Sequence, residues 1–227
     1  MKARLVSISK PAPELVKEGL YDVQELIAYC ARVSNPSNQF NTETSEKLIR
    51  YLVKHKHWSP LEMASACIEI ETTRDIARQI LRHRSFSFQE FSQRYADPTK
   101  ELEFVLREPR KQDDKNRQNS IEFNLRDDKE RQIAYQWEMH QNRVIEAARE
   151  VYAWAIEKGI AKEVARSVLP EGNTMSRLYV HGTLRSWVHY IELRSANGTQ
   201  KEHIEVAKAC AAAITETFPL VKEFCQV

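Results

Sequence analysis

The chain has 227 residues, of which 42% are hydrophobic and 29% charged, and its formal net charge is +2. This length and composition are typical of one soluble domain with an ordinary hydrophobic core. The near-neutral charge argues against general nucleic-acid binding, and the five glycines form neither a Rossmann fingerprint nor a P-loop.

The cysteines are widely separated and form no Cys-x-x-Cys pair: Cys30, Cys67, Cys210 and Cys225. Such spacing is typical of reduced thiols in a cytoplasmic protein rather than of a disulfide framework or a zinc site. No apolar run approaches the roughly 18 residues that cross a bilayer, and the first residues lack the long apolar stretch of a signal peptide. We therefore expect a cytoplasmic protein that does not enter the membrane.

In chain order, residues 1–9 predict a strand, and helical spacing of apolar residues predicts helices over about 23–33 and 43–55. The segment 34–38 between them has the composition of a loop. Residues 64–71 predict a strand, because Ile68 and Ile70 alternate with glutamates. Thr72, followed by Asp75, predicts the capped start of a helix that continues to about residue 81. Near its end Gln79 and Arg82, three residues apart, can reach the same ligand.

Residues 107–131 change character, because charged and amide side chains of both signs dominate the segment. We expect a partly mobile surface insertion in an otherwise single domain spanning 1–227. A long helix is predicted over about 127–158, with Gly159 beyond its end and an apolar stripe that faces the core or another subunit. A short helix (161–168), a strand (175–181) and helices over 183–195 and 200–217 follow. This order predicts an α+β domain with helices packed on a small sheet.

The most informative segment is Arg82-His83-Arg84, followed after seven residues by Ser92 and then by Arg94. Arginine presents a planar fork of donors that matches phosphate, carboxylate and the carbonyl edge of a pyrimidine. Several arginines in one short stretch, with hydroxyls and a carboxylate between them, predict a site for a small anionic ligand. A lone Arg-His-Arg triplet at a helix end can instead complement the helix dipole, so the interpretation depends on the wider pattern.

The common catalytic motifs are missing from the sequence. There is no Gly-x-Ser-x-Gly elbow and no His-Glu-x-x-His, and His55-x-His57 lacks a third metal ligand at a familiar spacing. No cysteine lies in an evidently electropositive turn, so a thiolate nucleophile has no support. We therefore expect no metal, and chemistry supplied by a cofactor while the protein contributes position and charge.

The Arg-His-Arg-x7-Ser pattern resembles the signature of the flavin-dependent thymidylate synthases. Further blocks that resemble the family occur in the right order, at 31–34, 57–62, 78–95 and 163–194. Met63 and Gln93 depart from the pattern, which favours histidine and a small residue there, and the segment 171–174 appears one residue longer than in some members. The resemblance implies a homotetramer with active sites built from several subunits.

The resemblance also implies the reaction, which is the methylation of dUMP to dTMP. The carbon donor is 5,10-methylenetetrahydrofolate, FAD reduced by NADPH supplies the hydride, and no enzymic cysteine attacks the pyrimidine. It assigns dUMP binding to Gln79, Arg82, Glu90, Phe91, Ser92, Gln93, Arg94, Arg166 and Arg194. It assigns FAD binding to Ser34, His57, Ser59, Arg82, His83, Arg84, Gln89, Glu90, Arg185 and His189.

Arg194 carries the implied catalytic role, because it would lie against the uracil edge and favour ionisation at N3. A fixed guanidinium suits that place, since electron density builds on the ring carbonyls and N3 during transfer. The implied phosphate site consists of the side chain of Arg94 and backbone N–H groups of the loop 90–94.

Other interpretations remain open at this point. A nucleic-acid-binding module could use the Arg-rich segment and the insertion, and its affinity would then fall steeply with salt. A non-catalytic relative that binds nucleotide is another, although none of the matched polar positions is lost. Taken singly, Glu62 and Glu90 could be surface carboxylates, His189 a partly buried histidine and Arg166 a helix-end charge.

Overall fold

The computed structural model describes residues 1–225, and its centre is a four-stranded antiparallel sheet in the order β1-β2-β6-β3. The strands are β1 (Lys2–Ile8), β2 (Ser65–Thr73), β6 (Met175–Thr183) and β3 (Ser87–Glu90). In the central pair Ile68 lies opposite Val180, and both side chains are buried. Their neighbours Glu69 and Tyr179 point to the other face, as the two-residue period of a strand requires.

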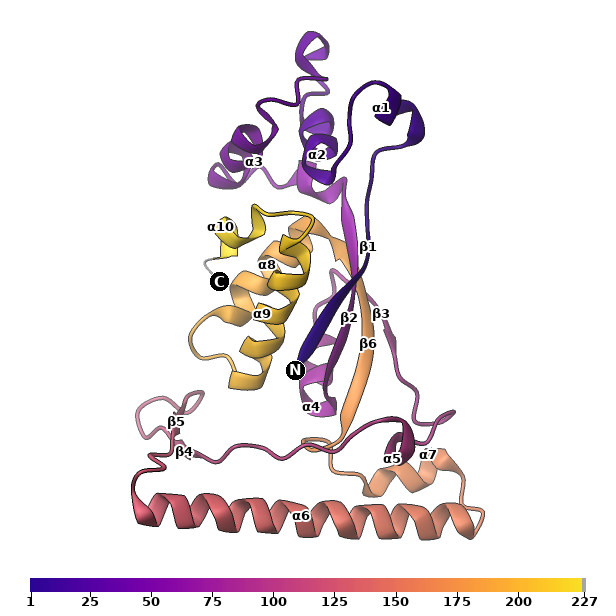
Figure 1. Cartoon of the computed structure of the whole chain (residues 1–227), viewed down its shortest axis with the longest axis vertical. Helices are drawn as coiled ribbons and strands as arrows, with labels where there is room; N and C mark the ends of the chain where they lie inside the picture. Colours follow the sequence, from indigo (N-terminus) through magenta and orange to yellow (C-terminus); the bar gives the residue numbers. More distant parts are fainter. Residues whose placement is uncertain (226–227) are drawn as a thin grey trace.

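Helices cover one face of this sheet (Figure 1). They are α8 (Leu184–Ser195), α9 (Lys201–Thr215) and the short α10 (Val221–Cys225). On α8 the predicted inward residues Leu184, Trp187, Val188 and Ile191 are all buried. Trp187 also donates its indole N–H to the Ala66 carbonyl at 3.1 Å, which ties α8 to β2. The main hydrophobic core therefore lies between these helices and the sheet.

The N-terminal helices lie together at one end of the sheet (Figure 1). They are α1 (Pro13–Lys17), α2 (Val23–Ala31) and α3 (Ser45–Lys54). A 3-10 turn precedes α3 (η1, Pro36–Asn38), and another follows it (η2, Ser59–Glu62). Asp22 and Glu25 form a capping box at the start of α2, in which each side chain accepts from the other's backbone N–H. The cap fixes where this helix begins.

The long helix α6 (Asp128–Glu157) crosses the opposite end of the molecule (Figure 1). Its 30 residues correspond to a length of about 45 Å. Its second half packs through Ala148, Tyr152 and Ala155 against the segment of α7 (Lys162–Ala165) and η3 (Arg166–Val168). By contrast, Ile133 and Val144 are about half exposed. The predicted apolar stripe is thus only partly core.

Within the insertion at 107–131, residues 110–112 (β4, Arg110–Gln112) pair with β5 (Ser120–Glu122). Not all of the segment is a solvated surface, because the Arg107 and Arg110 side chains are only 14% and 15% exposed and are ion-paired. Their guanidinium groups contact Asp75 and Glu202, which lie outside the segment. A charged stretch of sequence cannot reveal such distant partners.

The elements predicted from sequence are confirmed, with differences in detail. Helix α4 (Arg74–Ile80) begins after Thr73 rather than Thr72, and Thr73 does not cap it, because its hydroxyl bonds to the Asp75 side chain. The short elements α1, α5 (Pro98–Glu101), β3, β4, β5 and α10 were not predicted. None of the helices within residues 1–225 is long and apolar enough to span a bilayer.

Candidate functional site

The Arg82-His83-Arg84 turn follows α4 and is anchored by Phe86. The His83 N–H donates to the Ile80 carbonyl at 3.0 Å, which continues the last turn of the helix. The Phe86 ring packs on Trp187, with ring centroids 4.6 Å apart. It also lies directly over Gly182 of β6, where an added Cβ would come within 2.3 Å of the ring. The glycine therefore lets the ring, and with it the turn, lie against the sheet.

His83 and Arg194 are in direct contact. The Arg194 Nε–H donates to His83 Nε2 at 2.9 Å, so His83 must be neutral, with its proton on Nδ1. Burial, together with the charges of Arg194 and Arg82, lowers the pKa of His83 to about 4. Two positions that the sequence assigns to different ligands, flavin and nucleotide, therefore lie side by side.

Gln79 joins the same cluster. Its Oε1 lies 3.1 Å from Nδ1 of His203, and its Nε2 donates to Gln200 Oε1 at 2.9 Å. His203 is fully buried, and its Nε2 lies 3.0 Å from the Tyr190 hydroxyl. The Tyr190 ring packs edge-on against His83 at 4.9 Å between centroids. Gln79 and Arg194 are thus linked through a compact group of aromatic and imidazole rings.

The loop after β3 lies at another part of the sheet. Glu90 Oε1 accepts from the Ser176 hydroxyl at 2.9 Å and lies 3.7 Å from the guanidinium of buried Arg74. The Phe91 N–H donates to the Arg177 carbonyl at 2.8 Å, so it is not available for a phosphate, contrary to our expectation. The Gln93 side chain of this loop is also buried.

Arg94 contacts the segment that contains Arg166. Arg94 is exposed and pairs with Glu163 at 3.2 Å. Arg166 begins η3, three residues after Glu163, and is half-buried. Both arginines are therefore close to the segment that leads into β6, while Arg194 contacts His83 elsewhere. Ser92 accepts a 3.4 Å bond from the Arg94 N–H, which closes the loop locally.

The upstream flavin residues lie at the other end of β6. Arg185 forms an ion pair with Glu62 of η2, and the His189 ring packs edge-on against Trp58 at 4.4 Å. Burial, then the charge of Arg185, lowers the His189 pKa, so this histidine is neutral. Glu62 is thus a carboxylate paired with an arginine, which is one of the interpretations that the sequence left open. Exposed residues complete this end: Ser34, His57 and Ser59.

A strand rises about 3.3 Å per residue, so the nine residues of β6 separate its two ends by roughly 26 Å. The phosphate loop lies by the first residues of β6, since Phe91 bonds to Arg177. The Arg185 pair lies just past its last residue, where the Leu184 N–H donates to Ala64. One chain therefore gathers Gln79, the Arg82-His83-Arg84 turn and Arg194. The loop after β3 and the group around Arg185 lie apart from them and from each other. Gln89 is exposed on the edge strand β3.

Sequence reasoning missed the side chains that hold the predicted ones in place: His203, Tyr190, Ser176 and Arg74. For His203 a signal existed, because it shares the helical period of Val206, Ala207 and Cys210, which are all buried on α9. A histidine on an apolar stripe requires buried polar partners. The sequence could have raised that question without naming the partners.

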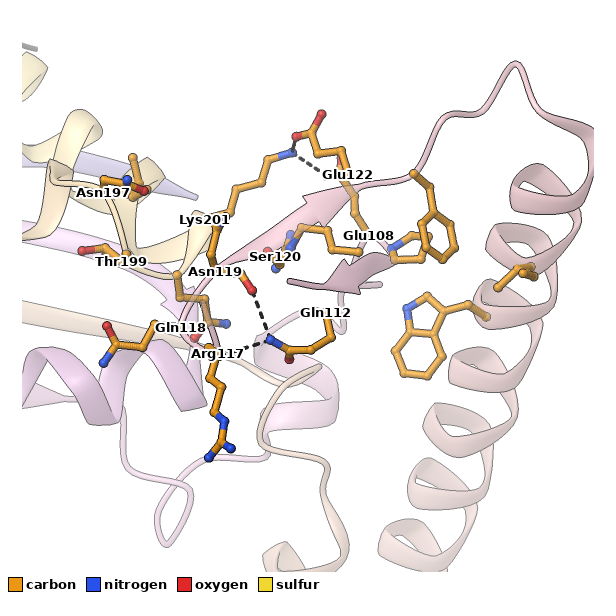
Figure 2. Close-up of a pocket in the computed structure, with 18 residues that line it drawn as sticks. Glu108, Gln112, Arg117, Gln118, Asn119, Ser120, Glu122, Asn197, Thr199 and Lys201 are labelled. Carbon is orange, nitrogen blue, oxygen red and sulfur yellow. Dashed lines mark hydrogen bonds and ion pairs between the residues drawn. The ribbon is translucent and has the colours of Figure 1, made fainter. Parts of the chain in front are cut away.

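A cleft of about 710 Å³ lies between the β4–β5 hairpin, α6 and the start of α9 (Figure 2). Its one link to the predicted site is Gln200, the partner of Gln79. Lys201 reaches Glu122 and Glu108 at 2.7 and 2.8 Å (Figure 2). Much of the charge in this cleft is thus paired internally, and the contacts fasten the insertion onto α9.

The cysteines do not offer a nucleophile. Burial raises the pKa of all four thiols, to about 12 at Cys225, where the charge of Glu192 adds to burial, and further still at Cys210. Within residues 1–225 no group of three or more His, Cys, Asp or Glu side chains is arranged to hold a metal ion. The site consists instead of guanidinium groups, amides and neutral imidazoles, which can bind and polarise an anionic, planar ligand.

The fold is shared with a pyrimidine-nucleotide enzyme. The UMP/dUMP methylase PolB from Streptomyces cacaoi, solved with 5-Br dUMP, superposes with a TM-score of 0.78 at 26% identity. The match covers 98% of this chain and 93% of PolB. The architecture of this chain is therefore that of the PolB methylase.

Sequence comparison identifies the family. Residues 15–220 match the family described as thymidylate synthase complementing protein. The chain is 47% identical to a probable flavin-dependent thymidylate synthase of Paramecium bursaria Chlorella virus 1 and to a flavin-dependent thymidylate synthase of Synechocystis, with 97% of both chains covered in each case. The chain belongs to this family.

Proposed function

We propose that the chain is a flavin-dependent thymidylate synthase, which methylates dUMP to dTMP with FAD as its cofactor. The co-substrates in this proposal are NADPH and 5,10-methylenetetrahydrofolate. The observation that carries it is the cluster of Gln79, His83 and Arg194, because these residues come from separate sequence blocks and meet in the folded chain. Family membership and the absence of an activated thiol support the same reaction.

The donor set fits a flavin dinucleotide. Arg82 and Arg84 are exposed at the turn after α4, and neither forms an ion pair with another residue of the described chain. Unpaired guanidinium groups suit a diphosphate, which accepts bidentate hydrogen bonds. His83, Gln89, Glu90 and the upstream residues Ser34, His57, Ser59, Arg185 and His189 would complete the contacts. When bound, FAD would supply the redox chemistry of the reaction.

The residues of the chain would bind and polarise dUMP. Arg194 is held through Nε by a neutral imidazole, so its outer N–H groups are available for the uracil carbonyls and N3. A preorganised cation at that edge stabilises negative charge as it develops on the ring. Arg94 and Arg166 would hold the phosphate with Ser92, and Gln79, Arg82 and Glu90 would fix the nucleoside.

We also propose that the active enzyme is a homotetramer with shared sites in the cytoplasm. The supporting observation is that one chain keeps the phosphate loop and the Arg185 pair at opposite ends of β6. A second is the exposed apolar surface of α6, which includes Ile133, Trp137, Val144, Val151 and Trp154. Light scattering should give a mass of four chains, and Val144→Asp should lower it. A monomeric, fully active wild type would contradict this part of the proposal.

The interpretation as a nucleic-acid module loses support from the same contacts. Four cations of the insertion and its surroundings are paired with carboxylates: Arg107, Arg110, Lys111 and Lys201. Paired cations release few counterions from a nucleic acid.

An absorbance spectrum tests the function directly. The purified protein should be yellow, and NADPH should bleach its flavin absorbance faster when dUMP is present. Formation of dTMP then requires the folate co-substrate. Colourless protein that takes up no flavin when FAD is added would overturn the proposal.

A further inference from the structure

His203 lies behind Gln79 and is not among the residues that the family resemblance implies. It is fully buried on the first turn of α9, between the Tyr190 hydroxyl at 3.0 Å and Gln79 Oε1 at 3.1 Å. The inference below rests on the proposed function, in which Gln79 contacts dUMP.

The hydrogen-bond chain has one arrangement of protons that satisfies every member. Burial raises the pKa of Tyr190 well above its ordinary value, so its hydroxyl keeps its proton and donates to His203 Nε2. Burial, with the nearby charge of Arg194, lowers the pKa of His203 to about 3, so this imidazole is neutral and carries its proton on Nδ1. The Nδ1–H must then donate to an acceptor, which is Gln79 Oε1.

The reverse orientation of the Gln79 amide would leave a buried donor unpaired. If the Gln79 nitrogen faced His203, Nδ1 would have to accept, and the imidazole proton would move to Nε2 toward the tyrosine oxygen. The Tyr190 hydroxyl has no other partner among residues 1–225, so its own proton would have no acceptor. Leaving a buried donor unpaired costs about 1–3 kcal/mol. The observed arrangement is therefore strongly favoured over the flipped amide.

The first turn of α9 is itself held firmly. Glu202, the neighbour of His203, accepts from Arg110 at 2.7 Å and lies 3.3 Å from Arg107. Burial acts to raise the Glu202 pKa, but the hydrogen bond from Arg110 and the two arginine charges hold it below its ordinary value. The histidine is thus attached to a fixed backbone on one side and to a fixed tyrosine on the other.

We propose that His203 is a positioning residue for the nucleotide: it fixes the Gln79 amide with its carbonyl inward and its nitrogen outward. The outward nitrogen donates one N–H to Gln200, and its second N–H is available to an acceptor on the ligand, such as a carbonyl or hydroxyl of dUMP. The Tyr190 hydroxyl sets the histidine tautomer, and both residues act only through Gln79.

Calorimetric titration of the FAD-loaded enzyme with dUMP tests the proposal. His203→Leu removes the donor at similar volume, and we expect dUMP to bind about 3- to 10-fold more weakly, the equivalent of one lost net hydrogen bond. His203→Asn keeps an amide N–H near the place of Nδ1 and should restore most of the affinity. The KM for the folate should not change. Equal losses in both variants, or a parallel loss of folate affinity, would overturn the proposal.

A hydroxyl deletion provides a second test that does not disturb packing. Tyr190→Phe frees His203 to adopt either tautomer, so dUMP affinity should fall by about threefold. The matched control is Tyr152→Phe, because Tyr152 is equally buried but its hydroxyl has no hydrogen-bond partner among the described residues. The control should bind dUMP as the wild type does. Unchanged dUMP affinity in Tyr190→Phe would contradict the inference even if His203→Leu failed to fold.

A double-mutant cycle separates positioning from general structural damage. In a Gln79→Met background, His203→Leu should cost no further dUMP affinity, since the residue through which it acts is absent. Additive losses would mean that His203 acts by another route and would overturn the proposal. The failure of the proposed function would look different, because the wild-type enzyme itself would then bind neither FAD nor dUMP.

Discussion

Arg194 and His83, which are 111 positions apart in the chain, share a hydrogen bond of 2.9 Å in which the guanidinium donates through Nε to a neutral imidazole. A protonated histidine at this place would repel the guanidinium and would have no free ring nitrogen to accept the hydrogen bond from Arg194. The contact therefore fixes the direction of the guanidinium while it leaves the positive charge on Arg194 alone. Most of our predictions concern this cluster and the contacts that support it.

Arg194→Ala should retain flavin but lose most dTMP formation. Removal of one preorganised group that stabilises developing charge typically costs at least about 100-fold in kcat. The measurement is single-turnover dTMP formation alongside the flavin absorbance of the same sample. Turnover like that of the wild type would remove the role proposed for this guanidinium.

The stability of the protein should depend on pH through His83. Its pKa is about 4 in the folded chain, against 6.5 ordinarily, so between these values only the unfolded chain binds the proton. The free energy of unfolding should therefore fall as the pH drops from about 6.5 toward 4. His83→Gln keeps an acceptor for Arg194 but cannot titrate, and its stability should fall less over this window. Urea unfolding of both proteins at several pH values makes the comparison, and identical slopes would refute the assignment.

Gly182→Ala should destabilise the fold. The new methyl group would lie 2.3 Å from the Phe86 ring, which is itself packed against Trp187 and cannot swing away freely. Overpacking of this kind costs about 1–3 kcal/mol. Gly172→Ala is the matched control, since nothing lies within 4 Å of a Cβ there. Thermal unfolding should show a lower Tm for the first variant only.

Glu202→Gln should weaken the attachment of the insertion to α9. The change removes the charge of a carboxylate that contacts both Arg110 and Arg107. A hydrogen bond to a charged group contributes about 1.5–3 kcal/mol to the free energy of unfolding. Glu146→Gln breaks an exposed pair with Arg149 and should cost well under about 1 kcal/mol. Denaturant unfolding measures both, and equal effects would show that burial of the first pair contributes nothing.

The sequence predicted most of the fold wherever a periodic pattern was long. Helix α8 is the clearest case, because Leu184, Trp187, Val188 and Ile191 recur at helical spacing and are all buried. The edge strand β3 has four residues, which are too few to establish a two-residue period. The helix α10 is too short, at five residues, for a helical period to be read from its sequence.

The sequence pattern singled out residues that meet in the folded chain, but not the residues packed behind them. Motif spacing indicated Gln79, His83 and Arg194, yet the partner His203 is 124 positions from Gln79 along the chain. Such contacts depend on how α9 packs, which no local pattern specifies. The same holds for Ser176 behind Glu90, where the pairing of β3 with β6 brings the two side chains together. Within one chain, the loop 90–94 and Arg185 lie at opposite ends of β6, which the spacing of the motifs does not reveal.

Arg107 connects the start of α4 to helix α6. Its guanidinium bonds to Thr73 and Asp75 at the start of α4, while its backbone N–H donates to Gln141 and its carbonyl accepts from Trp137, both on α6. Helix α4 carries Gln79, and α6 presents the surface assigned to neighbouring subunits. Arg107 thus links, through its side chain and its backbone, the helix that carries Gln79 to the helix whose exposed apolar surface we propose as a subunit contact, so a shift of α6 would be transmitted to the start of α4.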